Sequence, residues 1–68
     1  MINGVIVEHV QQRLLDLGYS VGQHGADGFY GSDTEAGVKL FQKEKGLKVD
    51  GWVGRDTWKV LFNSMSNP

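Results

Sequence analysis

The chain has 68 residues, of which 40% are hydrophobic, and it contains no cysteine. This length suits one small domain and excludes a second independent core, and the lack of cysteine excludes a disulfide or a thiolate metal site. Seven basic residues against eight acidic ones give a formal net charge of −1, which argues against a general nucleic-acid binder. No apolar run approaches the roughly 20 residues that span a bilayer, and the first residues lack a signal-peptide pattern, so no membrane insertion is expected.

The first predicted helix runs from about Val5 to Leu17. Its apolar face consists of residues three or four positions apart, namely Val7, Val10, Leu14 and Leu17. Gly18 suits the left-handed position that follows a helix, and Tyr19 can pack back on the last turn. A loop over residues 20–26 then leads into the first of two similar turns.

Two eight-residue segments, 27–34 and 50–57, align at an offset of 23 without a gap. They share five identical residues, and an aromatic residue follows Asp-Gly in both. The repeated turn residues are Asp27, Gly28, Gly31 and Thr34 in the first segment and Asp50, Gly51, Gly54 and Thr57 in the second. We expect the glycines to occupy positive-φ positions, the aspartates to accept backbone N–H bonds, and the threonines to support the caps of the following helices. The pattern predicts one structural unit used twice.

The second predicted helix opens at Ser32, which reads as the N-cap of a capping box closed by Glu35. Its expected core face contains Val38, Leu40 and Phe41. Gly46 ends this helix, and Leu47 packs back on it.

The third predicted helix begins near Asp56 and carries Trp58, Leu61 and Phe62, with Trp58 expected in the core. Residues 63–68 form a polar segment that we interpret as a flexible tail or the start of a linker, so the domain is placed at residues 1–62. The predicted fold class is all-α: a small three-helix bundle with two repeated Asp-Gly-x-x-Gly turns.

Charge is unevenly distributed along the chain. Residues 1–38 hold one base and five acids, whereas residues 39–68 hold six bases and three acids. The C-terminal half therefore favours an anionic partner, although a solvated basic helix face is the alternative explanation.

Two aromatic residues are candidates for ligand contact. Phe29 and Trp52 occupy equivalent repeat positions, and each precedes an apolar residue, Tyr30 or Val53, that we expect to be buried. Because neighbouring side chains of an extended turn point in opposite directions, Phe29 and Trp52 should be exposed. An exposed aromatic beside polar groups is suited to the weakly apolar face of a sugar.

Metal binding and catalysis are disfavoured by spacing. If Gly28 or Gly51 occupied the glycine position of an EF-hand, each loop would offer one carboxylate where calcium needs three or four. His9 and His24 have no metal-ligand spacing, and no nucleophile motif is present. We expect no metal, no cofactor and no catalytic residue.

The chain resembles the peptidoglycan-binding-like domains, the small three-helix modules of bacterial and phage cell-wall hydrolases, a related form of which occurs in matrix-metalloproteinase prodomains. The resemblance is carried by Val10-Gln11-x-x-Leu14, Gly18-Tyr19, the two Asp-Gly-x-x-Gly-x-x-Thr segments, Phe41-Gln42-x-x-x-Gly46-Leu47 and Trp58-x-x-Leu61. It departs at Gly37, where the family usually has Ala, and at Ser32 and Arg55, where the family often has Pro.

The resemblance implies a non-catalytic module that binds peptidoglycan and holds a covalently linked hydrolase, such as an amidase, peptidase or endolysin, on its substrate. It implies action outside the cell, in the wall or periplasm, or in the cytoplasm before release for a phage lysin. The alternative is a prodomain-like module that packs on and regulates its own enzyme. The predicted ligand contacts on glycan strand and stem peptide are Phe29, Trp52, Gln42, Lys48 and Arg55.

Overall fold

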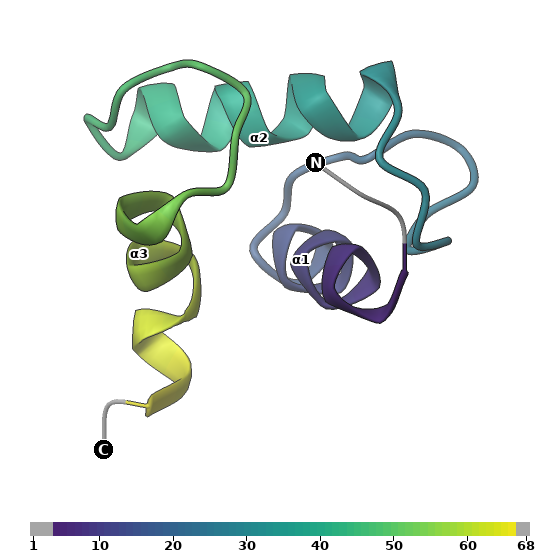
Figure 1. The fold of residues 1–68 in the computed structure, drawn as a ribbon, viewed down its shortest axis with the longest axis horizontal. Helices are drawn as coiled ribbons and strands as arrows, with labels where there is room; N and C mark the ends of the chain where they lie inside the picture. Colours follow the sequence, from purple (N-terminus) through teal and green to yellow (C-terminus); the bar gives the residue numbers. More distant parts are fainter. Residues whose placement is uncertain (1–3, 67–68) are drawn as a thin grey trace.

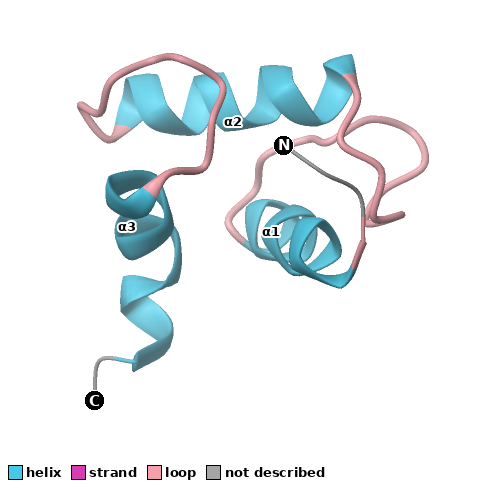
Figure 2. Ribbon diagram, viewed as in Figure 1, coloured by secondary structure: helices cyan, strands magenta, loops and turns pink. Residues whose placement is uncertain are grey.

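The computed structural model describes residues 4–66, and side chains within residues 4–62. Three helices follow one another, α1 (Val5–Asp16), α2 (Ser32–Glu44) and α3 (Arg55–Ser66), and residues 4–66 contain no strand. In Figure 1, α2 lies across the top, α3 runs downward and α1 is seen nearly end-on, so the helices point in three different directions. Long loops join them (Figure 2). The all-α prediction is confirmed.

Helix α1 ends in the predicted glycine cap. Gly18 has a φ of 95°, and its N–H donates to the Leu15 carbonyl at 3.0 Å. The Tyr19 N–H donates to the Leu14 carbonyl at 2.8 Å, which completes a Schellman motif. The Tyr19 ring then packs edge-on against Phe41, with 5.5 Å between ring centroids. This cap therefore directs the chain from α1 onto α2.

Helix α2 ends in the same way and begins differently from the prediction. Gly46 has a φ of 72°, and the Leu47 N–H donates to the Gln42 carbonyl at 2.8 Å. At the other end, the N-cap is Gly31 and no side chain bonds to the cap, so the expected capping box at Ser32 is wrong. Ser32 is the first helical residue, one position after the N-cap. An N-cap side chain accepts the backbone N–H of the second or third helical residue, and the Ser32 hydroxyl is not placed to do so.

Helix α3 begins at Arg55 and continues to Ser66. Residues 63–66, expected in a flexible tail, are therefore helical, and the rest of that expected tail, residues 67–68, lies outside the described residues. Trp58 was expected in the core, but it is 39% exposed. Its indole instead lies against Phe62 on the α1 side of the helix, with 4.3 Å between ring centroids.

The core lies where the three helices meet. Its buried residues are contributed by all three helices and by the loop after α1, and they are Val10, Leu14, Val21, Val38, Phe41 and Leu61. Val21 was not predicted, because it stands alone in a loop segment without periodicity. Leu17 and Leu40, both predicted to face the core, are 40% and 48% exposed. Leu40 lies one position before the buried Phe41, and Leu17 is the C-cap of α1, beyond its last helical residue.

The loop after α1 crosses α2 at Gly37, which is buried. A Cβ atom at Gly37 would lie 2.4 Å from the backbone carbonyl oxygen of Ser20, a distance that no real contact allows. In this chain, glycine therefore replaces the usual Ala because only glycine leaves room for the crossing loop. This packing requirement outweighs the helix-propensity cost of glycine, which is about 1 kcal/mol.

Candidate functional site

The first repeated turn is organised around the buried side chain of Gln11 on α1. Its Nε2 group donates to the Thr34 hydroxyl oxygen at 2.8 Å and to the Phe29 carbonyl at 2.9 Å. The same group lies 3.2 Å from Asp27 Oδ1, and the Gln11 Oε1 atom accepts the Gly28 N–H at 2.7 Å. One amide therefore joins α1, the turn and the first turn of α2.

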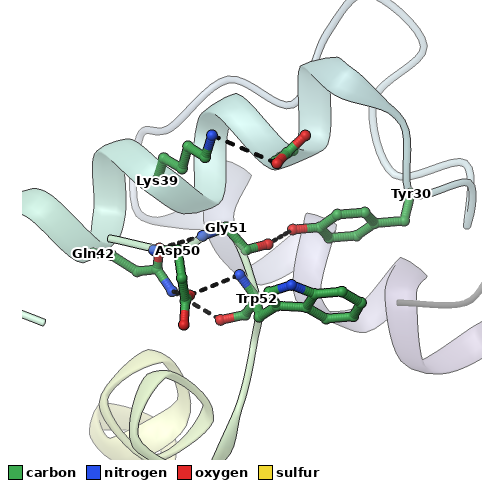
Figure 3. A network of polar contacts seen from close by, with 7 residues as sticks. Tyr30, Lys39, Gln42, Asp50, Gly51 and Trp52 are labelled. Atoms are coloured by element: carbon green, nitrogen blue, oxygen red, sulfur yellow. Dashed lines mark hydrogen bonds and ion pairs between the residues drawn. The ribbon is translucent and has the colours of Figure 1, made fainter. Parts of the chain in front are cut away.

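The second turn repeats this arrangement around Gln42 on α2 (Figure 3). Its Nε2 group donates to the Trp52 carbonyl at 2.8 Å, to Asp50 Oδ1 at 3.0 Å and to the Thr57 hydroxyl oxygen at 3.0 Å. Its Oε1 atom accepts the Gly51 N–H at 3.0 Å. The turn is thereby held between α2 and the start of α3, in a fixed shape.

Each aspartate also accepts a hydrogen bond from the backbone of its own turn. Asp27 Oδ1 accepts the Phe29 N–H at 3.0 Å, and Asp50 Oδ1 accepts the Trp52 N–H at 2.9 Å, as predicted. These backbone bonds are the largest cause that lowers the pKa of both carboxyls below the ordinary value, and the glutamine amides lower it further. Both aspartates are thus structural anions, ionised at neutral pH.

The glutamines correct one prediction and add one missed residue. Gln42, predicted to contact a ligand, is 0% exposed, and both ends of its amide are bonded within the domain. It therefore supports the site from beneath and does not face a ligand. Gln11 was missed because the 23-residue offset does not relate it to Gln42. The available signal was the pair of apolar-Gln dipeptides, Val10-Gln11 and Phe41-Gln42.

The repeated glycines do not all have the predicted role. Gly28 and Gly51 have φ values of 80° and 77°, in the left-handed region. Gly31 has a φ of −108° and is the N-cap of α2, where a Cβ atom would lie 2.8 Å from the Phe29 ring. Gly54 does not have a positive φ either, and its carbonyl accepts the Trp58 N–H at 2.8 Å. The threonines were expected to support caps, but their hydroxyls accept from the buried glutamines.

The second turn forms one wall of a hollow of about 330 Å3. Trp52 lines it with 57% of the residue exposed, and Lys48 and Arg55 line it from either side of the turn. The side chains of these two cations make no ion pair or hydrogen bond with other described residues. The structure thus brings together three of the predicted contact residues, beside the positive N-terminal end of α3.

Phe29 lies in a different place. It is 59% exposed, as predicted, and lines a smaller hollow of about 160 Å3 beside the first turn. That hollow contains Asp27, Asp33 and His24 and shares no lining residue with the Trp52 hollow. The two equivalent aromatics therefore occupy chemically different surroundings: the first hollow has two aspartates and no lysine or arginine among its described lining residues, and the second has two cations together with Asp50 and Asp56.

Tyr30 links the two turns. Its hydroxyl donates to the Gly51 carbonyl (Figure 3), and its ring is half-buried against the core. Burial raises the pKa of Tyr30 to about 12, with smaller contributions from the nearby Glu35 and Asp50 carboxylates. The phenol is therefore neutral and able to donate this bond at any physiological pH.

Two further observations concern the chemistry available to the domain. Within residues 4–66, no group of three or more His, Cys, Asp or Glu side chains is placed to hold a metal ion. Among the same residues, no helix has both the length and the apolar character needed to cross a bilayer.

Known proteins are similar to this chain in fold and in sequence. The family model described as "Putative peptidoglycan binding domain" matches residues 3–61. The crystal structure of the SleB N-terminal domain superposes with a TM-score of 0.85 at 32% identity, covering 96% of this chain and 86% of that one.

Curated relatives are much longer than this chain. A probable N-acetylmuramoyl-L-alanine amidase of Bacillus licheniformis is 42% identical over 60 residues, which cover 88% of this chain and 17% of the amidase. The type VI secretion system spike protein VgrG3 of Vibrio cholerae is 43% identical over an alignment of 70 positions, which covers 87% of this chain and 7% of that protein. The chain thus spans less than a fifth of these relatives, and it belongs to the peptidoglycan-binding domain family.

Proposed function

We propose that this domain binds peptidoglycan through the Trp52 hollow and does not itself catalyse a reaction. The observation that carries the proposal is the hollow beside the second turn, where an exposed indole is accompanied by two cations without ion-pair partners, Lys48 and Arg55, and by the carboxylates of Asp50 and Asp56. An aromatic surface flanked by charge suits a ligand with apolar and anionic parts, as the stem peptides of peptidoglycan have.

Each residue of the Trp52 hollow has a distinct part in this proposal. The Trp52 indole contacts the apolar surface of the wall polymer. Lys48 and Arg55 bind stem-peptide carboxylates, and the N-terminal end of α3 adds a favourable field for the same negative charge. The buried Gln42 holds the Trp52 backbone, so the indole is presented on a rigid turn and less conformational entropy is lost on binding.

Phe29 forms a second apolar contact in the proposal, outside the Trp52 hollow. It is as exposed as Trp52, but the described lining of its hollow has Asp27 and Asp33 with no lysine or arginine to offset them, which disfavours carboxylates. We therefore assign Phe29 to an uncharged part of the polymer and expect its contribution to be smaller.

The proposed role in a longer protein is attachment. A linked cell-wall hydrolase, such as an amidase, would be held at the wall by this domain, and its encounter with substrate becomes effectively intramolecular. This places the working protein at the cell wall or in the periplasm, or in the cytoplasm before release if it is a phage lysin.

The test is sedimentation of the domain with purified sacculi. The wild-type domain is expected to pellet at low salt. Removing a central aromatic contact usually costs more than about 1 kcal/mol, so Trp52→Ala should weaken binding about fivefold or more. Val49→Ala is the matched control, because Val49 is 49% exposed and does not line the hollow. Phe29→Ala should have a smaller effect than Trp52→Ala.

The cations are tested with charge-matched pairs. Lys48→Gln with Arg55→Gln should reduce pelleting and its salt dependence, whereas Lys43→Gln with Lys59→Gln removes the same charge outside the hollow. Equal losses for the two pairs would show that net charge alone is responsible. A wild-type domain that stays in the supernatant at low salt would refute the function, and unchanged pelleting by Trp52→Ala and by the Lys48/Arg55 pair would refute the site.

A further inference from the structure

A third hollow, larger than those of Trp52 and Phe29, lies between α1 and α3, away from both repeated turns. Its volume is about 410 Å3, within the range of about 300–1,000 Å3 that is common for ligand pockets. None of its lining residues belongs to the hollows of Trp52 or Phe29. Its lining residues come from facing sides of the two helices, and they are His9, Gln12, Arg13, Asp16, Trp58 and Phe62.

One wall of this groove is aromatic. Trp58 and Phe62 are one helical turn apart on α3, and their rings lie 4.3 Å apart at an angle of 40°. Trp58 keeps 39% of its surface exposed in spite of its size. The sequence pattern predicted Trp58 in the core, and its actual position leaves an apolar ring available beside polar groups.

The other wall is polar and ordered by hydrogen bonds. The Arg13 Nε group donates to the Leu61 carbonyl of α3 at 2.8 Å, which holds the Arg13 side chain across the gap between the two helices. Gln12 Nε2 donates to Asp16 Oδ1 at 3.1 Å along the exposed side of α1. Both sides therefore come from helices, which are the elements that hold a site most rigidly.

The charge on this wall identifies the class of ligand. Arg13 and Asp16 contribute one charge of each sign, and Gln12 offers a neutral amide with both donors and an acceptor. The groove differs from the Trp52 hollow in its lining, since it has two aromatic rings and one pair of opposite charges, whereas the Trp52 hollow has a single indole and four charged residues, Lys48, Arg55, Asp50 and Asp56. An aromatic wall facing mixed donors and acceptors of balanced charge fits a neutral ring with one apolar face and polar edges, as in an N-acetylhexosamine.

We propose that the groove between α1 and α3 binds the glycan strand of peptidoglycan, with a sugar face on Trp58 and its acetamido or hydroxyl groups on Gln12 and Asp16. This inference rests on the proposed function and divides the ligand between two sites. The stem peptide is bound at the Trp52 hollow, and the sugar chain is bound at the groove.

The two tryptophans of the chain make this division measurable, because one lies in each site. Trp52→Phe leaves Trp58 as the sole indole, and Trp58→Phe leaves Trp52. The probe is the tetramer of N-acetylglucosamine, which carries no peptide, titrated against intrinsic fluorescence. A saturable change is expected in the Trp52→Phe protein and no change in the Trp58→Phe protein.

Rim variants made in the Trp52→Phe protein test the polar contacts. Loss of one hydrogen-bonding group should weaken tetramer binding about three- to tenfold for Gln12→Ala or Asp16→Ala. Gln23→Ala and Glu8→Ala are the matched controls, since they remove the same groups outside the groove and should leave the affinity unchanged. Far-ultraviolet circular dichroism verifies that all variants retain their helices.

The outcomes separate this inference from the proposed function. If the Trp58 signal does not respond to the tetramer while the wild-type domain pellets with sacculi, the groove assignment is wrong and the function stands. A response of Trp52 in place of Trp58 likewise overturns the groove assignment. If the domain binds the tetramer at Trp58 and sacculi binding is insensitive to Trp52→Ala, the groove is supported and the assignment of the Trp52 hollow is refuted.

Discussion

The replacement Gln42→Leu tests whether a buried amide holds the second turn together. Leucine is similar in size to glutamine, so the change removes hydrogen bonding while it keeps most of the packing. Two partners of Gln42, the Gly51 N–H and the Thr57 hydroxyl oxygen, have buried hydrogen bonds to it. Both would lose these bonds without gaining contact with water.

The expected cost is a large part of the stability of the domain. Each buried polar group left without a partner costs about 1–3 kcal/mol, so two such groups cost about 2–6 kcal/mol. A domain has about 0.05–0.15 kcal/mol of stability per residue, which for 68 residues is about 3–10 kcal/mol in total. We therefore expect Gln42→Leu to be strongly destabilised or unfolded at room temperature, and Gln11→Leu to behave in the same way because Gln11 is equally buried.

The measurement is urea unfolding followed by far-ultraviolet circular dichroism, with the free energy obtained by linear extrapolation. Gln12→Leu on the exposed side of α1 is the matched control and should change stability by less than about 0.5 kcal/mol. If Gln42→Leu loses no more than this control, the buried amides do not stabilise the turns and the argument built on them is refuted.

Two further predictions concern glycine packing and pH. Gly37→Ala should destabilise the domain despite the higher helix propensity of alanine, because the new Cβ atom would lie 2.4 Å from the Ser20 carbonyl oxygen. The control is Gly54→Ala, which has open space around the new Cβ atom and should be nearly neutral in urea unfolding. A Gly37→Ala protein of unchanged or higher stability would contradict the close approach of loop and helix. Because the pKa of Asp50 in the folded state is below the ordinary 3.8, its ionised form stabilises the fold above that pH, and this contribution is lost as the pH falls through the folded value. Stability should therefore decline on acidification below about pH 4, and less steeply in Asp50→Asn, which keeps the acceptor oxygen but does not titrate; identical pH profiles would show that Asp50 has no such role.

Helix positions and caps were predictable because they depend on local sequence. The apolar spacing on α1 and the glycine after each of the first two helices act within a few residues, so their structural consequences are readable without the fold. The predictions for Leu40 and Trp58 were wrong for the opposite reason. Which side of a helix is covered depends on the neighbour that packs there, and an apolar residue at the edge of the stripe can remain exposed.

The candidate site was predictable only in part. The repeat placed Phe29 and Trp52 at equivalent exposed positions, and the structure confirms their exposure. Their separation into two hollows of different charge was not predictable, because those hollows are lined by residues from different loops and helix ends. The groove between α1 and α3 had no signal in any one segment, since half of its residues are ordinary polar positions of an exposed helix face.

Local spacing and motifs of a few residues were enough to predict a small all-α domain, its two repeated turns, its glycine caps and its family resemblance. The packing of distant segments explains why Gln11 and Gln42 are buried at the centre of the turns and why a crossing loop requires glycine at position 37. The same packing places Trp52 and Trp58 in separate hollows. These features arise where segments that are distant in the chain meet. A buried amide, a close backbone approach or a pocket depends on the residues on both of its sides, so the local sequence of one side does not reveal it.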